Sequence, residues 1–163
     1  TNFFAFGERV VYWATGWRVF NVHPFWGVGL GNAGFFFPQH LPSYAWALPE
    51  VMHVFYRASS IPNLKSFWVR ILAETGLAGF AAFLAWYYVL WQSSRFLWSA
   101  PQPLFRTIAA SGQFVLLAFL IEGFSVDTFA LPYLWVSLGL LSAASALFRQ
   151  QAAGENIADG LIH

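Results

Sequence analysis

Charge is the scarcest property of this sequence. Of its 163 residues, only 9% are Asp, Glu, Lys or Arg, whereas 58% are hydrophobic and 21% are aromatic. A soluble domain carries about 25% charged residues, so this chain cannot cover a globule of its size with water-compatible side chains. We therefore predict an all-α integral membrane protein with a sizeable portion outside the bilayer.

Further absences exclude other classes of site. The chain has no cysteine, which excludes a disulfide framework and a thiolate metal site. A net charge of +1 argues against a nucleic-acid partner, which needs a clustered basic face. The histidines and acids lack metal-ligand spacing, and there is no DxD-like pair. We therefore expect no metal, no cofactor and no nucleic acid.

Three apolar runs are long enough to cross a membrane. They cover about 68–91, 107–126 and 129–148, and each is near the ~20 residues that a bilayer requires. Arginines at positions 95, 106 and 149 flank their predicted inner ends, so the positive-inside rule places the loop between the first two runs in the cytoplasm. The polar tail, 149–163, is then cytoplasmic, and we expect residues 150–163 to be disordered.

Residues 1–67 are then predicted to form a large extracytoplasmic loop with short interfacial helices. Val10, Trp13, Trp17 and Phe20 recur at helical spacing, which predicts a helix from residue 1 to about 22. This helix is too charged to span the bilayer, and its Trp and Arg residues suit a membrane interface. Pro24 is predicted to end it.

A glycine-rich run follows the first helix. Gly27, Gly29, Gly31 and Asn32 belong to the sequence Gly-Val-Gly-Leu-Gly-Asn. Glycine permits positive φ, and successive backbone amides in such a loop can form a nest for an anion. The run therefore predicts either a cradle near a pyrophosphate or a tight turn packed beneath aromatic side chains, and both interpretations remain open.

The stretch from Lys65 to Phe80 joins polar sequence to apolar sequence. Arg70 and Glu74 are four residues apart, so on a helix they share a face and can pair. We predict one uninterrupted helix that begins at the membrane surface and enters the bilayer. Ionisable groups at such a boundary are costly, which makes them candidate functional residues. Glu74 would orient Arg70 or accept a proton.

The glycine run and the Lys65–Phe80 stretch resemble two signatures of the O-antigen ligase family and the related O-antigen polymerases. In the second signature, His is followed by Asn, Ser or Gln, and then, after nine residues, by a Gly-x-x-Gly pair. Here Ser66 is followed by nine residues and then by Gly76-Leu77-Ala78-Gly79, whereas Lys65 stands where the family has His. The resemblance implies further spans before Thr1, and we expect the present chain alone to be inactive.

The resemblance also implies an activity. Such a protein would be a metal-independent glycosyltransferase of the cytoplasmic (inner) membrane. It would transfer a glycan from undecaprenyl pyrophosphate to a hydroxyl of lipid A-core or another glycan acceptor, in lipopolysaccharide or other surface polysaccharide biosynthesis. Ligase and polymerase share these signatures, so the choice between them stays open. A non-catalytic module that binds membrane lipids or an assembly partner is the alternative.

Basic residues of the predicted outer region are the candidate pyrophosphate ligands. The resemblance points to Arg9 and Arg70, and Arg18 lies half a turn from Arg9 on the first helix. Lys65 suits phosphate as a point charge, since lysine is normally charged at neutral pH. It is a base only where its surroundings favour the neutral form. In the family, the His at the Lys65 position is proposed to activate the acceptor hydroxyl or to stabilise the leaving group. His53 and His40 could supply such a base here, or could be ordinary surface residues.

Overall fold

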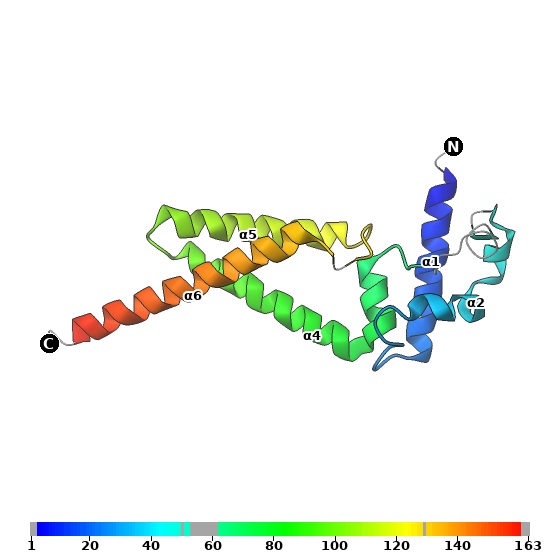
Figure 1. Ribbon diagram of the computed structural model, residues 1–163, viewed down its shortest axis with the longest axis horizontal. Helices are drawn as coiled ribbons and strands as arrows, with labels where there is room; N and C mark the ends of the chain where they lie inside the picture. The colour runs from blue at the N-terminus through cyan, green and yellow to red at the C-terminus, as the bar shows by residue number, and fades with distance from the viewer. Residues whose placement is uncertain (1–2, 50, 53–61, 129, 161–163) are drawn as a thin grey trace. The chain divides into compact units, whose positions relative to one another are not determined.

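The computed structural model describes residues 3–49, 51–52, 62–128 and 130–160. In this part of the chain all regular structure is helical, which confirms the predicted all-α class (Figure 1). The chain forms two compact units, one of residues 1–83 with 121–129 and one of residues 84–120 with 130–163. The boundary at 83/84 lies inside a helix.

The first unit is built on helix α1, Phe3–Val22, which ends before Pro24 as predicted. Short helices follow it: η1, Ala33–Phe36; α2, Phe37–His40; and η2, Ser43–Ala47. Helix α1 packs against both η1 and α2. The predicted extramembrane region therefore does contain short helices, held around one longer helix.

Helix α1 presents two different faces. Val11, Tyr12 and Val19 are fully buried in the core of the first unit, with the Tyr12 ring against that of Phe37 at 5.3 Å between centroids. The residues at helical spacing in the sequence lie partly on another face, since Trp17 is 53% exposed. The core therefore contains residues outside the set that the helical spacing indicated, and Trp17 lies on the surface.

Helix α4, Phe67–Trp98, is interrupted where one continuous helix was predicted. Gly76 has φ 64° and ψ −163°, far from helical values, so the ribbon consists of a short polar segment, 67–75, and a long apolar one, 77–98. The prediction of an uninterrupted helix was wrong, because sequence periodicity does not register a single residue with positive φ.

The second unit packs the remainder of α4 with α5, Pro103–Glu122, and α6, Pro132–Gly160. The Ser94 hydroxyl donates to the carbonyl of Ala109 at 2.8 Å, which ties α4 to α5. Phe148 of α6 places its ring 5.0 Å from that of Phe96 and 5.6 Å from that of Phe105, measured between centroids. All three helices therefore meet around one aromatic cluster.

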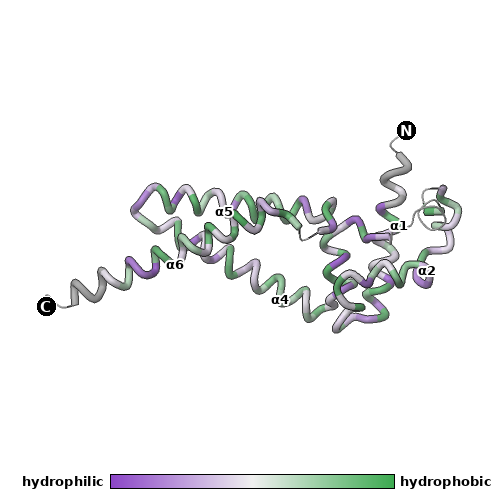
Figure 2. The backbone as a smooth tube through the Cα atoms, in the orientation of Figure 1, coloured by the Kyte–Doolittle hydropathy of each residue, from purple (hydrophilic) through white to green (hydrophobic). Residues whose placement is uncertain are grey.

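Two helices in the described part of the chain, α4 and α5, are long and apolar enough to cross a membrane. Only 28% of the apolar window of each is buried, unlike the core helix of a soluble protein, which is mostly buried. The hydrophobic colouring along these helices is visible in Figure 2. This supports a membrane protein. The third predicted span, 129–148, overlaps the first part of α6 and stays a prediction.

Helix α6 extends further than the sequence suggested. It runs to Gly160 through the polar segment that we expected to be disordered from residue 150. Expected disorder was therefore wrong for residues 150–160. The reason is that Gln, Ala and Glu in this segment are good helix formers even though they provide no apolar periodicity.

Candidate functional site

The glycine run and the second glycine pair, far apart in sequence, meet in the first unit. The amides of Val28 and Gly29 donate to the carbonyls of Ala73 and Glu74 at 3.0 and 2.8 Å. In the opposite direction, the amides of Leu77 and Ala78 donate to the carbonyls of Pro24 and Phe25 at 2.8 and 3.2 Å. Residues 24–29 thus satisfy backbone groups on both sides of the break in α4, which would otherwise lack helical partners.

Glycine is required on both sides of this contact. A Cβ on Gly76 would lie 2.5 Å from the carbonyl carbon of Phe25 and 2.7 Å from the amide nitrogen of Gly27. A Cβ on Gly27 would lie 2.5 Å from the amide nitrogen of Thr75. Both residues also have positive φ, 65° at Gly27 and 64° at Gly76. The two motifs are therefore two halves of one backbone junction.

This junction changes the interpretation of the predicted cradle. The amides of Gly27, Val28 and Gly29 all donate to carbonyls of the chain, that of Gly27 to His23 at 3.0 Å. Asn32 donates from its amide to the Gly29 carbonyl at 3.1 Å and from its side chain to the Val28 carbonyl at 3.1 Å. These donors are engaged, so the tight-turn alternative fits better than an anion nest. Gly31, with φ 80°, completes the turn.

Two aromatic side chains of the turn itself are exposed. Phe25 is 68% exposed and Trp26 is 81% exposed, while the turn itself packs on the break in α4. The glycine run is therefore a structural clamp whose aromatic tip points outward.

The predicted pair of Arg70 and Glu74 is confirmed. Arg70 Nε donates to Glu74 Oε2 at 3.1 Å, and the guanidinium also donates from Nη1 to the carbonyl of Asp127. The Glu74 side chain is only 4% exposed, whereas that of Arg70 is 27% exposed. Glu74 therefore holds Arg70 from the buried side and leaves part of the guanidinium open to a ligand.

Lys65 precedes a tight attachment between the start of α4 and the turn after α5. The amide of Phe67 donates to the carbonyls of Gly123 and Val126 at 2.8 and 2.6 Å, and the hydroxyl of Ser66, which is fully buried, donates to Gly123 at 3.2 Å. Lys65 itself has φ 53°, the left-handed region that residues other than glycine seldom adopt. The attachment fixes where the Lys65 side chain leaves the backbone.

Helix α1 contributes Arg9 to the same region. Trp13 Nε1 donates to the carbonyl of Lys65 at 3.5 Å, and a Cβ on Gly16 would lie 2.5 Å from methyl groups of Leu64 and Val69. The α1 face that carries positions 13 and 16 is thus against residues 64–69. Arg9 lies one turn before Trp13, so it shares that face.

Arg18 and His40 have structural partners elsewhere. Arg18 lies on the opposite side of α1 from Arg9, and its Nη1 donates to the carbonyl of His40 at 3.3 Å. His40 Nδ1 is 2.9 Å from the carbonyl of Phe36 and so carries the proton of this hydrogen bond. With Arg9 and Arg18 on opposite sides of α1, we do not expect one site to use both. His53 lies outside the described residues.

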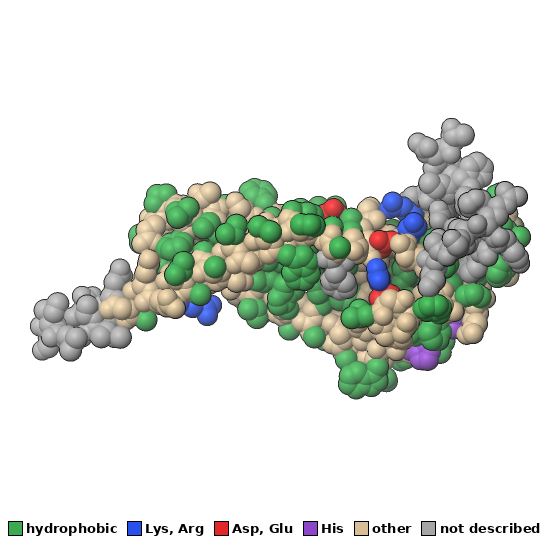
Figure 3. All heavy atoms as spheres, viewed as in Figure 1, with side chains coloured by type: hydrophobic (Ala, Val, Ile, Leu, Met, Phe, Trp, Pro, Cys, Tyr) green, Lys and Arg blue, Asp and Glu red, His purple; other side chains and the backbone are tan. Residues whose placement is uncertain are grey.

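The arrangement offers three cations and one buried carboxylate. Arg9 lies on α1, Lys65 precedes α4 and Arg70 lies on α4. Trp13 joins α1 to the Lys65 carbonyl, and Glu74 pairs with Arg70. Figure 3 shows basic and acidic side chains gathered on the part of the surface over α1 and the start of α4. Such a group suits an oxyanion with several acceptor oxygens, because guanidinium groups donate two parallel hydrogen bonds to phosphate.

The sequence analysis missed the residues that position these cations. Trp13 was assigned to an interfacial stripe, and Gly16 and the carbonyl of Asp127 were not considered. Gly16 did carry a signal, since a glycine within a helical pattern indicates a close packing partner. A backbone carbonyl carries no sequence signal, so the contact of Arg70 with Asp127 could not be found in this way.

Within the described residues, no group of three His, Asp or Glu side chains is placed to hold a metal ion. No protein-family model, no curated protein and no solved structure matches the chain.

Proposed function

We propose that the chain is the C-terminal part of a membrane glycan ligase of the O-antigen ligase family. The intact protein would transfer a glycan from undecaprenyl pyrophosphate to an acceptor hydroxyl of lipid A-core or another glycan, on the outer face of the cytoplasmic membrane. The single observation that carries the proposal is the junction at Gly27 and Gly76, because it joins the two stretches that resemble the family signatures.

The junction supports the proposal through Arg70. It ends the polar segment 67–75 at a fixed point, and this segment carries both Arg70 and Glu74. A guanidinium held at Nε and Nη1 is already oriented before a ligand arrives, so less conformational entropy is lost on binding. Preorganised cations are what a pyrophosphate leaving group requires, since negative charge develops on it in the transition state.

In the proposed reaction, the acceptor hydroxyl oxygen forms a bond to the anomeric carbon of the glycan, and the bond from that carbon to the pyrophosphate oxygen breaks. Arg70, Arg9 and Lys65 would bind the departing pyrophosphate. Glu74 is a positioning residue for Arg70, because it is buried and does not face the open side of the guanidinium. His53 remains the candidate base for the acceptor proton, and Lys65 is the other.

The same group of cations suits a polymerase, in which the acceptor is a second carrier-linked glycan. It also suits a non-catalytic module that binds an anionic lipid headgroup or a glycan-assembly partner, and Lys65 in place of the family's His favours this alternative. The ligase and polymerase reactions share a pyrophosphate ligand, so the acceptor that is used in the assay distinguishes them.

The test uses the full-length parent in a cell that lacks its own ligase. Transfer from lipid carrier to acceptor is measured for wild type and for Arg9→Ala, Arg70→Ala, Lys65→Ala and Lys65→Arg. Arg18→Ala is the matched control, because Arg18 is on the same helix as Arg9 but donates to His40 on its other side. Membrane levels of each variant are measured in parallel.

We expect Arg9→Ala and Arg70→Ala to lower transfer at least about tenfold, the equivalent of one lost charge-assisted hydrogen bond, with Arg18→Ala near wild type. Survival of Lys65→Arg with failure of Lys65→Ala would identify Lys65 as a charge and not a base. Equal activity of all variants would refute the site. Absence of transfer by wild type to any tested acceptor would favour the binding module.

A further inference from the structure

A cavity in the second unit, separate from the cations of the first, contains polar groups that the proposed function does not use. It lies between α4 and α6 and has a volume of about 480 Å³. Its lining changes from apolar residues, Trp86, Val89 and Leu90, to polar ones, Ser93, Ser145 and Arg149. Ligand cavities of roughly 300–1,000 Å³ combine an apolar wall with a few convergent polar groups in this way.

Two hydroxyl groups in this cavity lack a partner. Ser93 is 8% exposed and Ser145 is 4% exposed, yet neither hydroxyl forms a hydrogen bond within the described part of the chain. Neighbouring helical hydroxyls do bond, as Ser142 does to the carbonyl of Leu138 at 2.9 Å and Ser94 to that of Ala109. Neither oxygen is among the fully buried unpaired atoms of the described residues, so both keep surface on the cavity and can donate to a ligand there.

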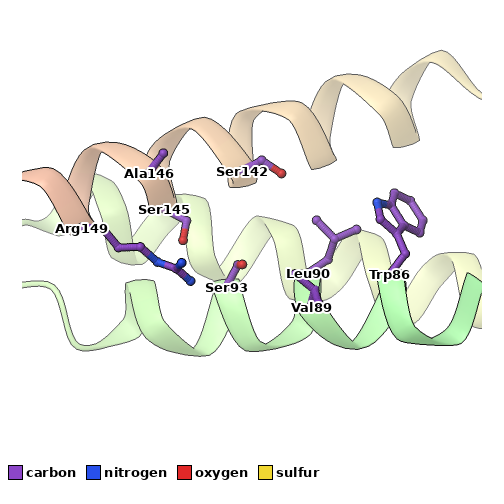
Figure 4. A pocket seen from close by; sticks show the side chains of 8 residues that line it. All are labelled: Trp86, Val89, Leu90, Ser93, Ser142, Ser145, Ala146 and Arg149. Carbon is purple, nitrogen blue, oxygen red and sulfur yellow. The ribbon is translucent and has the colours of Figure 1, made fainter. Parts of the chain in front are cut away.

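Arg149 provides the charge at the same place. Figure 4 shows Ser93 and Ser145 turned toward the space between α4 and α6, with the Arg149 side chain reaching into it. The guanidinium carbon stacks 5.3 Å from the centroid of the Phe96 ring, which leaves its N–H donors for an acceptor. Among the described side chains it forms no ion pair. One cation and two hydroxyl donors fit the oxygens of a phosphate.

The position along α4 suggests where that phosphate comes from. The apolar segment of α4 begins at Leu77, and about 20 helical residues span the ~30 Å hydrocarbon core, which places Phe96 near its opposite boundary. Arg149, stacked on Phe96, is then at the level of lipid headgroups. Val89 is 59% exposed, so the apolar end of the cavity is open to an acyl chain.

We propose that this cavity binds an anionic phospholipid, with its phosphate on Arg149, Ser93 and Ser145 and the start of an acyl chain along Leu90 and Trp86. The proposal needs α4 to cross the membrane but does not need glycan transfer. Under the topology predicted from loop charges, the bound lipid belongs to the cytoplasmic leaflet.

The test is native mass spectrometry of the detergent-solubilised full chain, titrated with phosphatidylglycerol or phosphatidylcholine. We expect wild type to prefer phosphatidylglycerol. Arg149→Ala should weaken its binding at least about tenfold, and Ser93→Ala with Ser145→Ala should weaken it several-fold, because charged hydrogen bonds contribute most. Arg149→Lys should retain part of the preference. Arg95→Ala is the matched control, since Arg95 is exposed on α4 and does not line the cavity.

Three results would overturn the proposal. Equal losses of phosphatidylglycerol binding in Arg149→Ala and Arg95→Ala would show that binding reflects general surface charge and not a specific site. Wild type with no preference for phosphatidylglycerol would exclude recognition of an anionic headgroup. Displacement of phosphatidylglycerol by millimolar inorganic phosphate would show that the cavity binds the free anion and not the lipid. Circular dichroism of each variant verifies that its helices are intact.

Discussion

Replacing Gly76 by alanine tests the backbone junction directly. The added Cβ would lie 2.5 Å from the Phe25 carbonyl carbon and 2.7 Å from the Gly27 nitrogen, in a backbone conformation that is essentially restricted to glycine. The backbone strain costs about 1–3 kcal/mol. Relieving the clash separates residues 24–29 from α4 and weakens hydrogen bonds worth about 1 kcal/mol each.

We therefore expect Gly76→Ala to lower the free energy of unfolding by about 3–5 kcal/mol. The assay is unfolding of the detergent-solubilised full chain by sodium dodecyl sulfate, followed by far-ultraviolet circular dichroism. Hydrogen exchange, read by mass spectrometry, should show faster exchange of the Val28 and Gly29 amides, because these donate across the junction.

Gly139→Ala is the matched control for this experiment. Gly139 lies within α6, has helical φ and has nothing within 4 Å of an added Cβ. We expect this substitution to leave stability unchanged or raise it by up to about 1 kcal/mol, the difference in helix propensity between alanine and glycine. If Gly76→Ala behaved like Gly139→Ala and the Val28 amide stayed protected, the junction as described would be refuted.

Two further predictions concern the start of α4. Arg70→Ala should lower the free energy of unfolding by about 1–3 kcal/mol, because it leaves the buried Glu74 carboxylate without its cation. A double-mutant cycle with Glu74→Ala should give a coupling of at least about 1 kcal/mol, and additive losses would contradict the pairing. Lys65→Gly should match or exceed wild-type stability by up to about 1 kcal/mol, because glycine relieves the left-handed conformation, whereas Lys65→Val should be less stable. Equal stabilities of the two Lys65 variants, measured by the same unfolding assay, would show that the conformation imposes no strain.

Much of the local structure could be predicted from composition and spacing. The all-α class followed from apolar runs of membrane length, and the end of α1 followed from Pro24. The pairing of Arg70 with Glu74 followed from i,i+4 spacing alone. These features are local, since each depends on residues within about one or two helical turns.

Other features could not be predicted because they depend on contacts between distant segments or on propensity. The break in α4 was missed because Gly76 resembles any helical glycine until residues 24–29 approach it. The glycine run left an anion nest and a tight turn both open, because its sequence does not show that its amides have acceptors near Glu74. The helical end of α6 was missed because periodicity was weighted above propensity.

The sequence by itself determined which residue types are available: a membrane-length set of apolar helices, two glycine motifs, and basic residues before the first apolar run. Only the tertiary structure decided which of them act together. It engaged Gly27 against Gly76 and gave Arg70 the Asp127 carbonyl as a second acceptor. The physical reason is that backbone hydrogen bonds and steric contacts between distant segments depend on positions in space, which spacing along the chain does not encode.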